Sequence, residues 1–406
     1  MNEKIFLQLN IIILISLLIK TKTKKEIKIS LKPKTITETD LIFLQKSFLK
    51  PTNQKIKNQF KEKLNKKLTE YSGKILIGNP IQEFEFLFDT GSANIIVTSN
   101  LCLNEACENK KKFNSSISKT YKEIFHIDNF VNDLIRNPIE RDKIYINFGT
   151  GQIKNYLSYE NICLENKVLC VNQIILLEAY ELSTIPFSQV SFDGIIGLSF
   201  TYLSINKQGN FIEMLFEQNR IDKKLFSFYF NINDNKSSSL NIGNIDYNNF
   251  IGEINWNDVI SENYWEIKID YIKYDNEMII NCENKINECS AIIDTGTSMI
   301  ASPNEIYDIL DKKLQVDMFC NNINELKNLI FKINGVEFIL EPDFYILKIP
   351  GEFNDNDNCL SAIMQINSMS SGNKQTFILG LPFLKKYYSI FDRDNKKIGF
   401  AFAKHT

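Results

Sequence analysis

A short motif occurs twice in this chain, each time directly after an apolar run. Residues 86–92 read FLFDTGS, and residues 291–297 read AIIDTGT. In both copies a stretch typical of a buried strand is followed by an aspartate, Asp89 or Asp294, at the start of a turn. An ionised carboxylate in such a place is costly unless hydrogen bonds and a function retain it. One D-T-G alone would indicate only a turn, but the matched flanks indicate an internal duplication.

Each copy is followed by a second motif, in which two apolar residues precede a glycine. FDGIIGLSF spans residues 192–200 and FILGLPF spans residues 377–383, so the glycines are Gly197 and Gly380. A glycine in such a run indicates the close approach of another backbone. A chain of 406 residues is long enough for two domains. We therefore expect two related lobes, each built around one D-T-G turn.

Short apolar or alternating runs bounded by Gly, Asn and Asp recur along the chain, a pattern typical of β-strands. Helical periodicity is confined to residues 42–67, 210–218 and 304–314. The sequence therefore predicts a mainly β protein. The run ICLENKVLC predicts a hairpin that turns at residues 166–167 and places Cys163 opposite Cys170.

The eight cysteines fall into local pairs, which indicates disulfides in an exported protein. A zinc site is the alternative, but no C-x-x-C occurs and the chain has two histidines. The same shortage of histidine argues against Ser-His-Asp and Cys-His catalysis. If the chain is an enzyme, carboxylates must carry the chemistry. The expected pairs are Cys102–Cys107, Cys163–Cys170, Cys282–Cys289 and Cys320–Cys359.

The N-terminus has the pattern of a signal peptide. Lys4 precedes an apolar segment, residues 5–19, and Lys20 follows it. This segment suits a signal-peptide core better than a full membrane span, because a span needs roughly 20 apolar residues. Residues 1–20 are therefore expected to direct the chain into the secretory pathway. An uncleaved signal anchor is the alternative, and only in that case do we expect contact with a membrane.

Charge is divided unevenly along the chain. Residues 1–67 carry 16 lysines and 5 acidic residues, whereas the remainder carries 31 basic and 44 acidic residues. Lysine-rich segments are often solvated tails or nucleic-acid-binding arms. Nothing after Lys67 resembles a nucleic-acid-binding module, so no nucleic-acid partner is expected. We favour a basic segment that lies across an acidic cleft of the same chain and neutralises it until it is removed.

Taken together, these motifs resemble the pepsin-like aspartic proteases. The resemblance extends from Tyr71 to Lys404 and includes both D-T-G turns, both apolar-apolar-Gly partners and a flap-like sequence, INFGTGQI, at residues 146–153. Three cysteine pairs lie near the family's usual places, and Cys163–Cys170 is an addition. The abundance of Asn, Lys and Ile also resembles malaria-parasite proteins, which narrows the expectation to the plasmepsins.

The resemblance implies a bilobal, mainly β fold with an active cleft between the lobes. The implied divisions are a signal segment at residues 1–20, a basic prosegment at 21–67, an N-terminal lobe at 68–225 and a C-terminal lobe at 226–406. In relatives the prosegment occupies the cleft, with a lysine near the two aspartates, and leaves in acid. The chain is thus expected to be a secreted zymogen, present in the secretory pathway, a vesicle, a vacuolar lumen or the medium.

Two carboxylates within hydrogen-bond reach cannot both ionise cheaply, so Asp89 and Asp294 are expected to share one proton. The pair then acts as a combined base and acid on a water that attacks a peptide carbonyl. Such an aspartic endopeptidase needs no metal or cofactor, and its partners are protein or peptide substrates and its own prosegment. The family resemblance implies supporting roles for Thr90, Gly91, Ser92, Thr295, Gly296 and Thr297.

In this resemblance the flap departs from the family pattern. Phe148 stands where most relatives have a tyrosine, and Ile96 stands where they have the tryptophan that bonds it. Losing both members leaves no orphaned polar group, so we expect Phe148 to pack on Ile96. The resemblance also implies that the backbone of Gly149, Thr150 and Gly296 binds an extended peptide. The side chains expected to form an apolar pocket are those of Leu87, Phe148, Phe187 and Ile195.

Two alternatives remain for the duplicated motif. Sugar kinases and actin-like ATPases also place D-x-G-T after a strand in each of two lobes, but they need an α/β fold and suit an exported, cysteine-paired chain poorly. A pepsin-fold peptide-binding protein with impaired catalysis is the second alternative. The presence of both aspartates argues against it, and the changes at Phe148 and Ile96 favour it.

Overall fold

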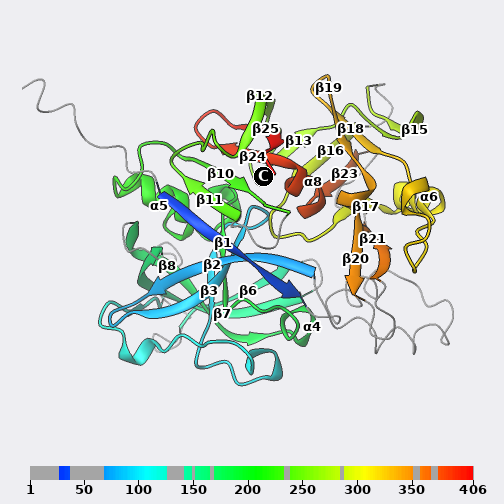
Figure 1. The fold of residues 1–406 in the computed structure, drawn as a ribbon. Coiled ribbons are helices and arrows are strands. Elements are labelled where there is room, and N and C mark those ends of the chain that lie inside the picture. Colours follow the sequence, from blue (N-terminus) through cyan, green and yellow to red (C-terminus); the bar gives the residue numbers. More distant parts are fainter. Residues whose placement is uncertain are drawn as a thin grey trace, which may run out of the picture.

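The computed structural model of the chain describes residues 27–36, 68–125, 141–148, 151–164, 169–232, 238–283, 288–350, 357–366 and 374–405. The described chain is mostly β-strand, as the sequence predicts, and its strands lie in two regions joined by a continuous sheet (Figure 1). Several predicted features lie outside the described residues. These are the signal segment, the helix at residues 42–67, the hairpin turn at 166–167, and Gly149 and Thr150.

The largest sheet has the strand order β12-β25-β24-β10-β11-β1-β2-β3-β9-β4-β8-β7-β5, with β6 paired to β7. β1, drawn in dark blue in Figure 1, connects the two regions, because its first half pairs with β11 and its second half with β2. This strand is the only described part of the expected prosegment, and it lies in the sheet. The bounds are β1 Ile27–Ile36, β2 Leu68–Ile77, β3 Gln82–Asp89, β4 Ile95–Thr98, β5 Lys122–Glu123, β6 Lys143–Phe148, β7 Gly151–Leu164, β8 Cys170–Leu182, β9 Gly194–Gly197, β10 Leu225–Tyr229, β11 Ser238–Ile242, β12 Phe250–Asp258, β24 Tyr387–Asp392 and β25 Lys397–Ala403.

The remaining described strands form smaller sheets that contain the second D-T-G turn. β16 (Glu288–Ile293) leads into that turn within the order β13-β16-β23-β17-β22. The strand-like run YWEIKIDYIKY, residues 264–274, is divided between two sheets. The chain leaves β13 at Lys268 and starts β14 at Tyr271. The other bounds are β13 Glu266–Lys268, β14 Tyr271–Tyr274, β15 Glu277–Asn281, β17 Ile300–Pro303, β18 Leu329–Ile333, β19 Val336–Leu340, β20 Ile346–Pro350, β21 Asp357–Ser361, β22 Ile363–Ile366 and β23 Lys374–Leu379.

The two D-T-G turns have the same strand connectivity around them. In the first copy β3 pairs in parallel with β9, β9 pairs antiparallel with β4, and β4 pairs in parallel with β8. In the second copy β16 pairs in parallel with β23, β23 antiparallel with β17, and β17 in parallel with β22. This repeated connectivity supports the internal duplication inferred from the sequence.

Gly197 and Gly380 occupy equivalent tight positions in this connectivity. A Cβ added at Gly197 would lie 2.4 Å from the backbone nitrogen of Ala93, and one added at Gly380 would lie 2.1 Å from the carbonyl oxygen of Thr297. Real Cβ atoms do not approach backbone so closely. The expected close approach of backbones is therefore confirmed at both glycines.

The described helices are short. Two were predicted from the sequence: α5 at Phe211–Glu217, where the Asn210 side chain accepts a hydrogen bond from the amide of Glu213, and α6 at Asn304–Leu314. α8 (Leu381–Lys386) was not predicted, and it begins directly after Gly380 with a proline in its first turn. The others are α4 Thr184–Phe187, α7 Pro342–Tyr345, and the 3₁₀ turns η1 Glu105–Cys107, η2 Ser115–Ile117, η3 Thr201–Leu203, η4 Lys207–Gly209 and η5 Ile323–Glu325.

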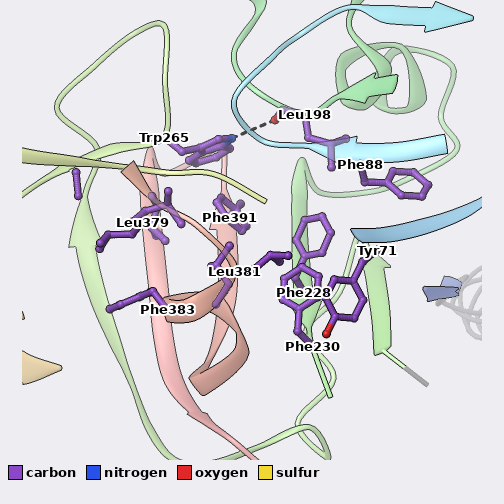
Figure 2. Close-up of a cluster of buried hydrophobic side chains, with 14 of the residues drawn as sticks. Tyr71, Phe88, Leu198, Phe228, Phe230, Trp265, Leu379, Leu381, Phe383 and Phe391 are labelled. Atoms are coloured by element: carbon purple, nitrogen blue, oxygen red, sulfur yellow. Dashed lines mark hydrogen bonds between the residues drawn. The ribbon is translucent and has the colours of Figure 1, made fainter. Parts of the chain in front are cut away.

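A core of aromatic side chains lies where the two regions meet. Trp265 is fully buried, and its ring contacts those of Phe200 and Phe226. It also contacts the ring of Phe391 (Figure 2). The rings of Phe226 and Phe391 are stacked, with centroids 5.0 Å apart. Aromatic contacts of this kind add to the stabilisation from buried apolar area. The core therefore holds the chain around Trp265, directly before β13, against the strands that follow the first D-T-G turn.

All four predicted disulfides are present, and the described chain has no free cysteine. Cys163 and Cys170 lie directly opposite one another on β7 and β8, as the hairpin register predicts. Among the described residues, no helix has both the length and the apolar character needed to span a membrane.

Candidate active site

Asp89 is the last residue of β3, a strand that becomes fully buried over its final residues. Its carboxylate accepts hydrogen bonds from two groups of the following turn. The Gly91 amide donates to Oδ1 at 2.8 Å, and the Ser92 hydroxyl donates to Oδ2. These bonds offset part of the cost of burying a carboxylate at the end of an apolar strand.

Asp294 has the same set of partners after β16. The Gly296 amide donates to its Oδ1 at 2.8 Å, and the Thr297 hydroxyl donates to its Oδ2 at 2.5 Å. In each turn the amide of the glycine and the hydroxyl of the following residue therefore bond the aspartate. Within this set of bonds, the two turns differ in the hydroxyl residue that binds the outer oxygen, Ser92 in the first and Thr297 in the second.

Two threonines connect the turns. The Thr90 hydroxyl donates to the carbonyl oxygen of Ile293 at 2.8 Å and accepts from the Thr295 amide at 2.9 Å. Thr295 makes the reciprocal bonds, to the carbonyl oxygen of Phe88 at 2.7 Å and from the Thr90 amide at 3.0 Å. Both threonines are buried. The four bonds hold the ends of β3 and β16 side by side.

The glycines of the turns allow the two carboxyl groups to meet. A Cβ at Gly91 would lie 2.7 Å from Oδ2 of Asp294, and one at Gly296 would lie 2.4 Å from Oδ1 of Asp89. Each aspartate thus lies against the glycine of the other turn. The side chains of Asp89 and Asp294 are within hydrogen-bond reach of one another.

The two carboxyl groups have different surroundings. Asp89 is buried, whereas Asp294 is partly exposed. Burial, and then the nearby Asp294 carboxylate, raise the pKa of Asp89 well above its usual range, while the bonds from Ser92 and Gly91 act in the opposite direction. A pair of this kind titrates as a unit, with one proton retained over a range in which an isolated aspartate would be ionised.

Phe148 is the last residue of β6, and it lies among apolar side chains. Its ring meets that of Phe187 edge-on, with centroids 5.9 Å apart. It packs against the cluster that contains Ile96 and Phe187, and against the cluster formed by Leu87, Phe192 and Ile195. The structure therefore gathers the predicted pocket residues around Phe148.

A small pocket adjoins this group and is lined by Ile96, Phe187 and Ile195, among other residues. Lys110 also lines it and was not singled out from the sequence. Its Nζ donates to the carbonyl oxygens of Val190 at 2.8 Å and Phe192 at 3.0 Å, so its charge is satisfied within the wall. No sequence signal distinguishes this lysine from its neighbours Lys111 and Lys112.

Comparison with known proteins agrees with this geometry. A sequence model described as eukaryotic aspartyl protease matches residues 70–403. The chain belongs to this aspartyl protease family. Pepsin A of Sus scrofa is 31% identical over 341 residues, which cover 82% of this chain and 81% of that protein. Pepsin A of Bos taurus is 31% identical over 342 residues, covering 82% of this chain and 84% of that protein.

A further similar protein is pregnancy-associated glycoprotein 2 of Bos taurus, 31% identical over 341 residues, which cover 82% of each chain. As an aspartyl protease family member with a mostly β structure, the chain has the bilobal pepsin-like fold that the sequence predicts. The alternative of an α/β kinase or ATPase is wrong, because the described sheets are built with few and short helices.

Sequence reasoning missed two neighbouring residues of this aspartyl protease site, Tyr264 and Trp265. Burial, and then the nearby Asp294 and Asp89 carboxylates, raise the pKa of Tyr264 above its usual value. The carbonyl oxygen of Trp265 accepts a hydrogen bond from the amide of Ile293, directly before Asp294. An aromatic pair at the start of a strand indicates core packing as readily as a site, so the sequence did not distinguish these two residues.

Proposed function

We propose that this chain is an aspartic endopeptidase in which Asp89 and Asp294 form the catalytic pair. The observation that supports this most strongly is the meeting of two carboxyl groups, each bonded by the amide and hydroxyl of its own turn. Two aspartates in one polar cage, with one pKa raised, form a combined acid and base.

In the proposed reaction a water molecule lies between the two carboxyl groups. The ionised aspartate accepts a proton from this water, whose oxygen attacks the carbonyl carbon of the peptide bond. The protonated aspartate donates a hydrogen bond to the carbonyl oxygen and stabilises the charge that develops there. The aspartate that accepted the proton then returns it to the peptide nitrogen. The C–N bond breaks, and the amine and the carboxylic acid are released. Ser92 and Thr297 hold the outer oxygens, so that the inner oxygens face the water.

The proposed substrate is a protein or peptide bound in extended form beneath the flap. β6 and β7 pair from Lys143 with Tyr156 to Phe148 with Gly151, and this pair is the proposed base of the flap. Backbone groups of Gly149, Thr150 and Gly296 would bind the peptide as an added strand. The apolar group around Phe148 predicts a preference for bulky apolar side chains beside the cleaved bond.

We also propose that the protein is made as a secreted zymogen, with a prosegment at residues 21–67 and lobes at 68–225 and 226–406. The four disulfides favour passage through an oxidising compartment. The proposed lobe boundary falls at the start of β10 (Leu225–Tyr229), in the sheet that joins the two regions. The narrower plasmepsin assignment depends on composition alone and stays a prediction.

A second candidate is a peptide-binding protein of the same fold with impaired catalysis. Phe148 has no hydroxyl to donate, and Ile96 offers no polar partner, so the contacts of the Phe148 side chain are apolar. The intact set of hydrogen bonds around both aspartates favours the endopeptidase over this candidate.

A peptide-library digest tests the proposal. The full chain is incubated in mild acid, its N-terminus is sequenced, and cleavage products are identified by mass spectrometry beside an Asp294→Asn control. We expect cuts between bulky apolar residues in the unaltered chain and none in the control. A requirement for charged residues on both sides of the cut would overturn the predicted specificity. Binding without cleavage by the folded, processed protein would favour the second candidate.

A further inference from the structure

The dipeptide Leu198–Ser199, which follows Gly197, lies between the first D-T-G turn and the second half of the molecule. Its two amides donate to the first turn: Leu198 to the carbonyl oxygen of Asp89 at 2.7 Å, and Ser199 to that of Ser92 at 2.8 Å. The dipeptide is thus bonded at both ends of the turn that contains Asp89. Both of its residues are fully buried.

Each remaining polar group of the dipeptide binds a residue of the second half, and the Ser199 carbonyl oxygen also accepts from the Asn210 amide side chain at 2.9 Å. The indole Nε1–H of Trp265 donates to the carbonyl oxygen of Leu198 at 3.1 Å, the bond drawn in Figure 2. The Ser199 hydroxyl donates to the carbonyl oxygen of Asn263 at 2.6 Å, and Nη1 of Arg393 donates to the carbonyl oxygen of Ser199 at 2.6 Å. We call these three bonds the clasp.

Trp265 also bonds the strand that ends before the other aspartate, Asp294. Its carbonyl oxygen accepts from the amide of Ile293 at 2.9 Å, and Ile293 directly precedes Asp294. One residue therefore bonds the strand of Asp294 through its backbone and the support of Asp89 through its side chain. This route is separate from the bonds of Thr90 and Thr295, which join the turns themselves.

Among the described residues of the second half, no equivalent of the clasp is present. There the dipeptide after Gly380 is Leu381–Pro382, and proline has no amide to donate. Leu381 donates to the carbonyl oxygen of Thr297 at 2.9 Å, and α8 begins at this residue. The support of Asp89 is thus bonded to the opposite half, whereas that of Asp294 continues into a helix of its own half.

We propose that Trp265 is a positioning residue of the catalytic pair, which acts through Leu198 to set the place of Asp89 relative to Asp294. The inference rests on the proposed endopeptidase function and adds a residue that touches neither substrate nor water. An indole at the centre of an aromatic core is rigid, because its contacts with Phe200, Phe226 and Phe391 surround it. A rigid donor fixes the position of the Leu198 carbonyl. The Leu198 amide is then held as well, and it donates to the carbonyl oxygen of Asp89.

The substitution Trp265→Phe tests this, because it keeps an aromatic ring and removes the indole N–H. Steady-state kinetics are measured on the full chain after incubation in mild acid. We expect kcat to fall about tenfold, because small displacements of catalytic groups are costly, and KM to change less than about twofold, because the substrate-binding surfaces are untouched. The two limbs of the kcat–pH profile should move closer together, because the two carboxyl groups interact less when Asp89 shifts.

The chain supplies a matched control in its only other tryptophan, Trp256. This side chain packs in a separate cluster with Tyr388 and Ile390, so Trp256→Phe should leave kcat and the pH profile unchanged. An unchanged kcat and pH profile in folded Trp265→Phe would overturn the proposal. If Trp265→Phe does not fold, Ser199→Ala decides instead, because it removes only the bond to Asn263. We expect a kcat about threefold lower for that variant, and an unchanged kcat would overturn the clasp.

A titration that needs no turnover separates this proposal from the proposed function. In the same samples, carboxyl carbons of ¹³C-labelled aspartate are followed by NMR, with Asp89 assigned from an Asp89→Asn spectrum. The clasp predicts that Trp265→Phe moves the Asp89 titration toward the ordinary aspartate range by about half a pH unit or more. If the unaltered protein fails to cleave peptides but shows this shift, the endopeptidase proposal fails and the clasp stands. An Asp89 titration identical in both proteins overturns the clasp, whatever the activity.

Discussion

The two D-T-G halves of the molecule have the same connectivity but different surroundings. Each aspartate ends a buried strand, receives an amide and a hydroxyl bond from its own turn, and lies beside a glycine that admits no side chain. Asp89, however, is buried and bonded indirectly to the opposite half, whereas Asp294 is partly exposed. The duplication therefore supplies the symmetric cage, and the later divergence of the two halves supplies the difference between the carboxyl groups.

That difference has a chemical use. If the two carboxyl groups lay in identical sites, the shared proton would bind both equally. Burial favours the neutral form of Asp89, because an ion is costly to desolvate. An asymmetric pair therefore has a defined protonation state before substrate binds, which general acid–base catalysis requires. Matched substitutions in the two halves should have equal effects where the halves agree and unequal effects where they differ.

Gly197→Ala and Gly380→Ala should both destabilise the protein severely. A methyl group at either position would overlap backbone atoms that cannot move without breaking the strand pairing. We expect the free energy of unfolding to fall by more than about 3 kcal/mol in each, or the chain not to fold. Gly209→Ala is the control, because its Cβ would meet nothing closer than 3.6 Å. Thermal unfolding measures all three, and a tolerated Gly197→Ala beside a damaging Gly380→Ala would show that the halves are not equivalent.

Thr90→Val and Thr295→Val should have nearly equal effects. Each removes a hydroxyl that donates one bond to, and accepts one from, the opposite strand end, and leaves two buried backbone groups without a partner. We expect a loss of about 2–4 kcal/mol in stability together with a large loss of kcat. Thr98→Val is the matched control, because Thr98 is buried and bonds a backbone carbonyl away from the pair. Unequal losses of kcat in the two variants would contradict a symmetric connection between the turns.

Asp89→Asn should stabilise the protein at neutral pH. Because the folded state raises the pKa of Asp89, it holds a proton that the unfolded chain releases, and the unaltered protein loses stability as pH rises from the ordinary aspartate range of about 4 through the folded pKa. Asparagine cannot ionise, so its advantage should be present at pH 7 and should vanish in acid. Denaturant unfolding between pH 4 and pH 8 measures this. An advantage of Asn that grows toward acid would have the wrong sign.

The flap provides the smallest expected effect. Phe148→Tyr adds a hydroxyl to a side chain packed among apolar neighbours, and Ile96 cannot bond it. We expect kcat/KM to change less than about threefold in Phe148→Tyr. The double variant Phe148→Tyr, Ile96→Trp should have a higher kcat/KM than either single variant, because the indole supplies a polar partner for the hydroxyl. A large gain from Phe148→Tyr alone would show that the hydroxyl finds another partner in the first half.

Much of the candidate site follows from the sequence because it is local. A D-T-G turn bonds its own aspartate through residues two and three positions away, so Gly91 and Ser92 can be inferred from the motif. The cysteine pairs are predictable for the same reason, since three of them join residues five to seven positions apart. Strand β1 was not predicted, because its pairing with both β2 and β11 depends on how distant parts of the chain meet.

The clasp shows why the rest could not be predicted. The bond from Trp265 to Leu198 joins residues 67 positions apart, and that from Arg393 to Ser199 joins residues 194 positions apart. A buried tryptophan in a sequence indicates core packing, and nothing in its neighbours indicates where the indole N–H is directed. Differences between the halves are likewise invisible, because the motifs around Asp89 and Asp294 are nearly identical while their burial is not.

The central claim is that Asp89 and Asp294 act as one catalytic unit. The most direct measurement is peptide cleavage as a function of pH by the acid-treated full chain, beside Asp89→Ala and Asp294→Ala variants shown by circular dichroism to be folded. We expect a bell-shaped profile in mild acid for the unaltered chain, and a loss of cleavage of at least about a thousandfold in both variants, since either substitution alone removes the shared proton. Substantial cleavage by either variant would contradict the shared-proton pair.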